Sequence, residues 1–239
     1  MSDVYFSKEN LDYYLKELAK DYRKNNGKNV PAEIILIGGA SVVINYGFRE
    51  MTYDMDAIIN ASSSLKDSIN TIGDRFGLPN GWMNDDFKRT ESYTPKLEQY
   101  ARYYRTYSNI VTFRTITAEY LIAMKMKSGR RYKYDRSDII GILWDQEKNG
   151  DSLSIERVKK AVEDLYGNYD VVSCEVREFV EQAIKDGGYE EKYSLIRQLE
   201  IENKDNLLEY QEIKSDVITE DNVDDIIDAL RKRKEKNKS

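Results

Sequence analysis

The chain has 239 residues, of which 40% are hydrophobic and 33% charged, with a formal net charge of −6, one cysteine and no histidine. These values describe a soluble globular protein with one large domain or two small ones, and the missing histidine excludes Ser-His-Asp catalysis, Cys-His catalysis and most zinc enzymes. The lone cysteine excludes an internal disulfide, and we find neither a signal pattern nor about 18 consecutive apolar residues, so we expect a cytoplasmic protein without membrane contact.

The first half of the chain alternates between helical and strand patterns. Leu11, Leu15 and Leu18 have helical spacing after the candidate N-cap Ser7, and this helix should end before Gly27. Apolar runs bounded by glycines, and a segment rich in Tyr, Thr, Val and Ile, predict strands. We expect a strand at 32–39, a short helix at 40–48, a strand at 54–59, a helix at 62–76 and turns at 77–95. Residues 100–116 predict either one strand or two, the latter as a hairpin that turns at Ser108 and Asn109.

From Thr117 onward almost every segment has helical spacing. Ser, Thr or Asp precedes most of these segments, as expected of N-caps. We therefore predict an α/β core at residues 1–116 and a helical domain at residues 117–239. The candidate helix starts are Thr117, Asp135 or Ser137, Ser154 and Ser173.

Two aspartates open the second predicted strand. Asp54 and Asp56 are two residues apart, so in a strand their carboxylates point to the same side, while Met55 and Ala57 face the core. Two neighbouring anions repel, and Mg²⁺ that binds both carboxylates together with substrate phosphates would relieve this repulsion. The alternative is a solvated strand edge or loop with two incidental acids.

A glycine pair ends the first predicted strand. Gly38 and Gly39 feed a short helix, and such a corner presents free backbone N–H groups to a phosphate, with Ser41 as a further donor. The alternative is a tight turn that binds no ligand. Arg49 could hold a phosphate or could anchor the turn by bonding a carbonyl oxygen.

The combination of these features resembles a known signature. G-G-x-S after a strand, then R-x-x-T-x-D-x-D before a second strand, resembles the nucleotidyltransferase superfamily with the polymerase-beta-like fold. The stretch "IGGASVVINYGFREMTYDMDAII" is most similar to the AbiEii/AbiGii branch, found among toxins of bacterial toxin–antitoxin and phage-defence systems. That branch also carries a helix with a lysine followed by R…D…D. The segment "AEYLIAMKMKSGRRYKYDRSDII" matches it with Lys125, Arg130, Asp135 and Asp138.

The resemblance implies an α+β fold, with an N-terminal mixed sheet flanked by helices and a helical C-terminal region. It also implies a mechanism in which Asp54 and Asp56 hold Mg²⁺ (or Mn²⁺) against the phosphates of a nucleoside triphosphate, and Lys125 neutralises the leaving pyrophosphate. The implied catalytic residues are Asp54, Asp56 and Lys125, and the implied nucleotide-binding residues are Gly38, Gly39, Ser41, Arg49, Thr52, Lys125 and Arg130.

The superfamily usually supplies a third carboxylate from a later strand, and the candidate strand here has none. Asp135 or Asp138 could be the third metal ligand, the site could work with two acids, or it could be partly disabled. Alternatively, Asp135 and Asp138 are an N-cap and a first-turn acid. Lys127, Arg130 and Arg131 surround Lys125, so more than one base could meet the phosphates.

The sequence contains fewer indications of the acceptor, the molecule that would receive the nucleotide. Residues 86–136 carry twelve basic and five acidic side chains, interleaved with tyrosines that could stack on the bases of an RNA such as a tRNA end, or could fill a half-buried sheet surface. The leading hypothesis is a toxin-type nucleotidyltransferase that modifies RNA or protein and has a cognate antitoxin. The alternatives are an inactive relative that binds nucleotide, RNA or a partner, and an enzyme that modifies a small aminoglycoside-like molecule, whose acceptor pocket should be acidic.

Overall fold

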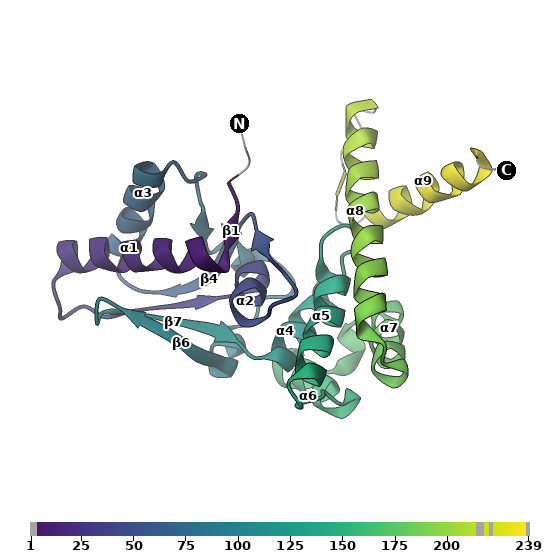
Figure 1. Cartoon of the computed structure of the whole chain (residues 1–239), viewed down its shortest axis with the longest axis horizontal. Helices are drawn as coiled ribbons and strands as arrows, with labels where there is room; N and C mark the ends of the chain where they lie inside the picture. Colours follow the sequence, from purple (N-terminus) through teal and green to yellow (C-terminus); the bar gives the residue numbers. More distant parts are fainter. Residues whose placement is uncertain (1–3, 214–217, 220–221, 238–239) are drawn as a thin grey trace.

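The computed structural model describes residues 4–213, 218–219 and 222–237. Figure 1 shows a sheet with helices on its faces, followed by a group of helices at one end of the sheet. The predicted α+β fold, with a mixed sheet and a helical C-terminal region, is confirmed. Within the described residues, none of the helices combines the length and apolar character needed to cross a bilayer.

The main sheet is mixed and has the strand order β5-β4-β2-β7-β6. The central strand β2 pairs antiparallel with β4 and parallel with β7, while β5 is parallel to β4 and β6 antiparallel to β7. The predicted hairpin between β6 and β7 is confirmed, with Ser108 and Asn109 both in the left-handed region. The strands are β2 (Ala32–Leu36), β4 (Met55–Asn60), β5 (Met83–Asn84), β6 (Ala101–Tyr107) and β7 (Val111–Ile116).

Strand β2 is buried on both faces because its apolar residues alternate between two cores. Ile34 and Leu36 pack with the N-terminal helices, whereas Ile35 and Ile37 pack with the C-terminal helices. This explains the uninterrupted apolar run in the sequence, since a strand covered on both sides has no polar face.

Three helices pack around the sheet in the N-terminal part. α1 (Lys8–Asn26) and α3 (Ser64–Phe76) contact each other and bury their apolar sides in the same core as Ile34. Ser7 caps α1 as predicted, in a capping box with Asn10. α2 (Gly38–Asn45) begins at the first glycine, two residues before the predicted start.

The segment between α3 and β6 contains more structure than the turns expected for residues 77–95. β5 adds an edge strand, and the 3₁₀ helices η1 (Asp86–Arg89) and η2 (Pro95–Tyr100) follow it. A strand of two residues has no detectable periodicity, so the sequence could not reveal it. A separate two-stranded sheet pairs β1 (Phe6–Ser7) with β3 (Met51–Thr52), so the residues before α1 lie beside the segment that precedes Asp54.

The C-terminal part is helical, and its helix starts at Thr117, Ser154 and Ser173 are confirmed as N-caps. One apolar core joins these helices to one face of the sheet, because Ile35 and Ile58 belong to the same cluster as Leu121 and Ile139. The division into two domains at residue 116 stays a prediction. The helices are α4 (Ala118–Ser128), α5 (Asp135–Lys148), α6 (Ile155–Tyr166), η3 (Tyr169–Val171), α7 (Cys174–Asp186), α8 (Tyr189–Ile213) and α9 (Val223–Asn237).

Candidate active site

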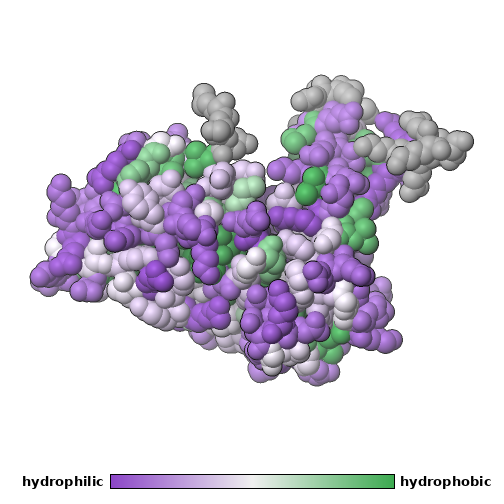
Figure 2. Space-filling view, in the orientation of Figure 1, coloured by the Kyte–Doolittle hydropathy of each residue, from purple (hydrophilic) through white to green (hydrophobic). Residues whose placement is uncertain are grey.

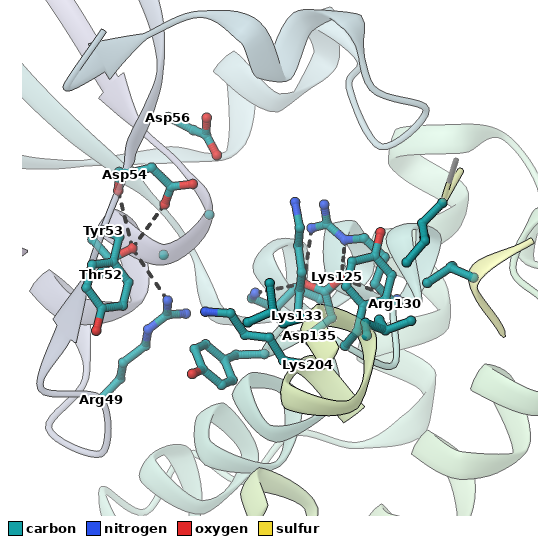
Figure 3. Close-up of a pocket in the computed structure, with 18 of the residues that line it drawn as sticks. Arg49, Thr52, Tyr53, Asp54, Asp56, Lys125, Arg130, Lys133, Asp135 and Lys204 are labelled. Atoms are coloured by element: carbon teal, nitrogen blue, oxygen red, sulfur yellow. Dashed lines mark hydrogen bonds and ion pairs between the residues drawn. The ribbon is translucent and has the colours of Figure 1, made fainter. Parts of the chain in front are cut away.

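Asp54 and Asp56 line one cavity of about 450 Å³ between the sheet and the C-terminal helices (Figure 3). Asp54 is exposed and lies just before β4, whereas Asp56 is half-buried within the strand. Met55 and Ala57 are fully buried, so the strand turns its apolar residues to the core and its acids to the cavity. The two carboxylates therefore share one space, as the D-x-D spacing predicts.

The glycine pair forms another wall of this cavity. A Cβ on Gly38 would lie 3.4 Å from Oδ2 of Asp56, so the start of α2 directly adjoins the acidic pair. A Cβ on Gly39 would overlap the hydroxyl of Thr52, and only glycine fits there. The strand end, the helix start and the D-x-D segment are thus packed together, with no room for a side chain at Gly39.

Arg49 and Thr52 connect the glycine corner to Asp54. The Thr52 hydroxyl donates to Oδ1 of Asp54 at 3.1 Å, and Nη2 of Arg49 donates to the same hydroxyl oxygen at 3.4 Å. Nε of Arg49 also donates to the Met51 carbonyl oxygen at 3.0 Å, so Arg49 anchors the turn and lines the cavity at the same time. This chain of contacts gives a physical reason for the R-x-x-T-x-D spacing, because it fixes the orientation of Asp54.

The electrostatic environment of Asp56 favours a cation in the cavity. Burial, followed by the negative charge of Asp54, raises the pKa of Asp56 to about 6, against the opposing charges of Lys133 and Arg130. Asp86 in η1 acts in the same direction as Asp54, although it does not line the cavity. Two ionised carboxylates at this position are costly unless a positive group lies between them.

The second motif forms a buried network of ion pairs. Nζ of Lys125 lies 2.7 Å from Oδ2 of Asp138 and 3.2 Å from Oδ1 of Asp135, and Nε of Arg130 lies 2.8 Å from Oδ2 of Asp135. Although burial raises the pKa of Asp135, the charges of Lys125 and Arg130 outweigh it and hold that pKa well below its usual range. Asp135 is therefore ionised at neutral pH and keeps both cations at the edge of the cavity.

That Asp135 or Asp138 is a third metal ligand stays a prediction: Asp135 lines the cavity, but the contacts of both carboxylates are with basic side chains. Both carboxylates lie in the first turn of α5 and are neutralised by basic side chains, and Asp138 is fully buried away from the cavity lining. Within the described part of the chain, no group of three His, Cys, Asp or Glu side chains could hold a metal ion. Asp135 pairs with Lys125 and Arg130, and Asp138 pairs with Lys125 and Arg49.

Ser41 also differs from its expected role as a phosphate donor. It is fully buried, and its hydroxyl oxygen accepts from the Ile116 amide at 3.2 Å and from Nδ2 of Asn45 at 3.3 Å. Ser41 does not line the cavity, because it lies on the inner side of α2. Its hydroxyl instead joins α2 to the end of β7.

Several residues that line the cavity were not singled out from the sequence. Figure 3 shows Lys133 and Lys204 on the side of the cavity opposite Asp54 and Asp56, and Nζ of Lys204 lies 5.9 Å from the ring centroid of Tyr53. Helix α8 therefore reaches across to the D-x-D segment. Four residues of this helix line the cavity and recur at helical spacings of three and four positions, which is the only sign of this face in the sequence. They are Lys204, Leu207, Leu208 and Gln211.

Helix α8 also caps the helix that carries the second motif. Tyr134, the N-cap residue of α5, makes no side-chain cap, and Oε1 of Glu200 instead accepts from the amides of Arg136 and Ser137 at 2.9 and 3.3 Å. Burial raises the pKa of Glu200 to about 7, despite these hydrogen bonds. The guanidinium of Arg197 stacks 3.3 Å from the ring centroid of Tyr134. These contacts hold the first turn of α5 against α8.

Comparison with known proteins gave one finding. A family model described as "Nucleotidyltransferase of unknown function (DUF6036)" matches residues 13–194, which is more than half of the chain. The match begins in α1 and ends in α8, so it includes the glycine corner, both acids and the Lys125 network. No curated protein and no solved structure gave a significant match.

Proposed function

The chain belongs to the nucleotidyltransferase family DUF6036, and from this premise we propose that it transfers a nucleotide from a nucleoside triphosphate to an acceptor, in a reaction that needs Mg²⁺ or Mn²⁺. One observation carries the proposal. Two carboxylates, a glycine corner and the buried Lys125 face the same cavity, and they come from segments that are far apart in the chain.

The residues present fit a divalent metal ion. Mg²⁺ in nucleotide sites is bound by one or two carboxylates, with substrate phosphates and water completing the coordination, so Asp54 and Asp56 suffice as protein ligands. The fit is supported by the shared cavity that both carboxylates line, where burial and the charge of Asp54 both raise the pKa of Asp56 and a divalent cation would offset both effects. Bound there, the metal would stabilise charge on the phosphates during displacement at the α-phosphorus.

The remaining side chains have separate tasks in this proposal. The backbone at Gly38 and Gly39 receives the phosphates, since no Cβ blocks their approach. Lys125 and Arg130 supply positive charge next to the leaving pyrophosphate, and Asp135 keeps both of them in place. Thr52 orients Asp54 through its hydroxyl. In-line attack at the α-phosphorus joins the nucleotide to an acceptor hydroxyl or phosphate and releases pyrophosphate.

For the acceptor, we propose RNA or protein, with the toxin-type role of the AbiEii-like branch and a cognate antitoxin as partner. Support comes from the amino-acid sequences of both motifs and from the basic side chains at the cavity. Lys133 and Lys204 line the cavity and are not part of the ion pairs around Lys125. An aminoglycoside-like acceptor would need an acidic pocket, and this cavity has more basic than acidic lining residues. In this proposal the protein acts in the cytoplasm.

A second candidate function is that of an inactive relative that binds nucleotide without transferring it. It is favoured by one observation, the lack of a third acid beside Asp54 and Asp56 among the described residues. Such a protein would still bind a nucleoside triphosphate at the glycine corner.

The test is an incubation of the protein with each of the four α-labelled nucleoside triphosphates and Mg²⁺, in parallel with total RNA, total protein and an aminoglycoside. Label on RNA or protein, lost in Asp54→Asn and Asp56→Asn but kept in the exposed control Asp74→Asn, supports the proposal. Label on the aminoglycoside would mean that the acceptor is a small molecule. Nucleotide binding without transfer to any acceptor would favour the inactive relative.

A further inference from the structure

The cavity has two chemically different ends. The end near the glycine corner is charged and contains Asp54, Asp56 and Lys125. The other end is formed by apolar side chains of α8 and α9 together with Tyr132 and Ile218, most of which pack in or against one small cluster. The apolar lining residues at this end are Tyr132, Leu207, Leu208, Ile218 and Val223.

The apolar end is supplied mainly by residues outside the family match, which stops at residue 194. Leu207 and Val223 are buried in a small cluster that also contains Ile227, so this wall has its own packed support. Leu208, in contrast, lies in the cavity wall with its side chain half-exposed. Figure 2 shows apolar surface along α8 beside a hollow between this helix and the N-terminal part.

We propose that this apolar end binds the nucleobase of the donor nucleoside triphosphate, with Leu208 against the base. This inference rests on the proposed function, because the phosphates must occupy the charged end. A nucleobase has apolar faces and polar edges, which suits a wall of leucine and valine with Lys204 and Gln211 beside it. A cavity of about 450 Å³ is within the usual range for a small-molecule ligand.

Because both ends belong to the same cavity, we assign the apolar end to the base of the donor nucleotide and not to a group of the acceptor. The triphosphate and the base belong to one molecule, joined through the ribose, and one cavity contains both kinds of wall. Lys204 lies between the two ends, next to Tyr53 on the opposite wall, where the ribose would pass. An acceptor would have to approach the α-phosphorus from outside the path that the triphosphate, ribose and base occupy in the cavity.

The proposal is tested with Leu208→Ala, measured by the dissociation constants of ATP, CTP, GTP, UTP and inorganic tripolyphosphate in the presence of Mg²⁺. Tripolyphosphate has the phosphates but no base. We expect Leu208→Ala to weaken the best nucleotide roughly tenfold, since apolar contact with the base is lost, and to leave tripolyphosphate unchanged. The matched control is Leu195→Ala, an exposed leucine on the same helix that does not line the cavity.

Two results would overturn the inference while leaving the proposed function intact. In the first, the wild-type protein binds tripolyphosphate with the same dissociation constant as every nucleotide. In the second, Leu208→Ala leaves the dissociation constant of the best nucleotide unchanged. If neither tripolyphosphate nor any nucleotide binds, or if Asp56→Asn leaves Mg²⁺-dependent binding unaltered, the proposed function itself fails, and this inference with it.

Discussion

Arg49 and Asp138 are 89 positions apart in the chain, yet Nη1 of Arg49 lies 2.5 Å from Oδ2 of Asp138. The same carboxylate oxygen is 2.7 Å from Nζ of Lys125. Asp138 therefore joins the first motif, in the sheet half, to the second motif, in the helical half. All three groups have little or no exposure, so the pairing is protected from solvent screening.

Removal of this shared carboxylate should destabilise the fold. In Asp138→Asn, two buried cations lose their common anion, and breaking a buried pair in this way costs about 3–5 kcal/mol in the free energy of unfolding. Urea denaturation of wild type and variant measures the difference. The control is Asp151→Asn, which removes an exposed partner of Arg157 and should cost less than about 1 kcal/mol. Equal effects in both variants would contradict a joining role for Asp138.

The glycine corner should not tolerate a methyl group. In Gly39→Ala, the new Cβ meets the Thr52 hydroxyl and the Arg49 guanidinium, so the D-x-D segment must shift, at a cost of about 1–3 kcal/mol. Transfer activity should fall with it, because Asp54 is oriented by the same Thr52. Gly47→Ala is the matched control: a Cβ there meets nothing within 4 Å, and the stability change should stay within about 0.5 kcal/mol. A stable, active Gly39→Ala protein would show that the corner is less crowded than described.

Thr52 should act as a positioning residue. Thr52→Val keeps the shape but removes the hydroxyl that donates to Asp54, and loss of a group that orients a metal-binding carboxylate typically lowers activity or metal affinity about 10- to 100-fold. Thr52→Ser restores the hydroxyl and should recover most of the activity. The measurement is the Mg²⁺ concentration dependence of transfer for all three proteins. A Ser variant as weak as the Val variant would point to packing of the methyl group instead.

Glu200 should make stability depend on pH between about 4.5 and 7. Its pKa is raised from 4.5 to about 7 in the folded protein, so in this window the folded state holds a proton that the unfolded state has released. The stabilisation from this proton is complete below pH 4.5 and is lost as the pH rises toward 7, by about 3 kcal/mol in total. Glu200→Gln keeps an acceptor for the Arg136 and Ser137 amides and should flatten this slope.

The difference in unfolding free energy between wild type and Glu200→Gln, measured by urea denaturation at several pH values, isolates this residue from other titrating groups. The difference should shift in favour of the variant as the pH rises through the window. A pH-independent difference would mean that Glu200 is ionised in the folded protein throughout this range.

Local sequence features were enough to predict much of the fold and part of the candidate site. Helical spacing and N-cap residues gave α1 and the helices after Thr117, and the apolar run ending in glycines gave β2. The D-x-D pair and the glycine pair were recognisable because each depends on residues close together in the chain. Their presence in one cavity follows from the antiparallel pairing of β2 with β4.

Features that depend on distant contacts were not predictable. Nothing near Asp138 in the sequence shows that Arg49 neutralises it, and Ser41 looks like a donor until the Ile116 amide is placed beside it. Glu200 resembles any helix-surface acid, although it caps α5 from another helix. The apolar positions of α8 likewise have no partner in the sequence. In each case the decisive neighbour is fixed only when the helices pack.

The most direct test of the central claim, that Asp54 and Asp56 share one divalent cation beside the glycine corner, is a crystal structure with Mn²⁺ and a nucleoside triphosphate analogue that resists cleavage at its α-phosphorus. We expect an anomalous Mn²⁺ peak within ligand distance of both carboxylates, about 2.0–2.3 Å, with the triphosphate against Gly38 and Gly39. A metal and triphosphate bound elsewhere, or a triphosphate in the cavity with no metal on either aspartate, would contradict it.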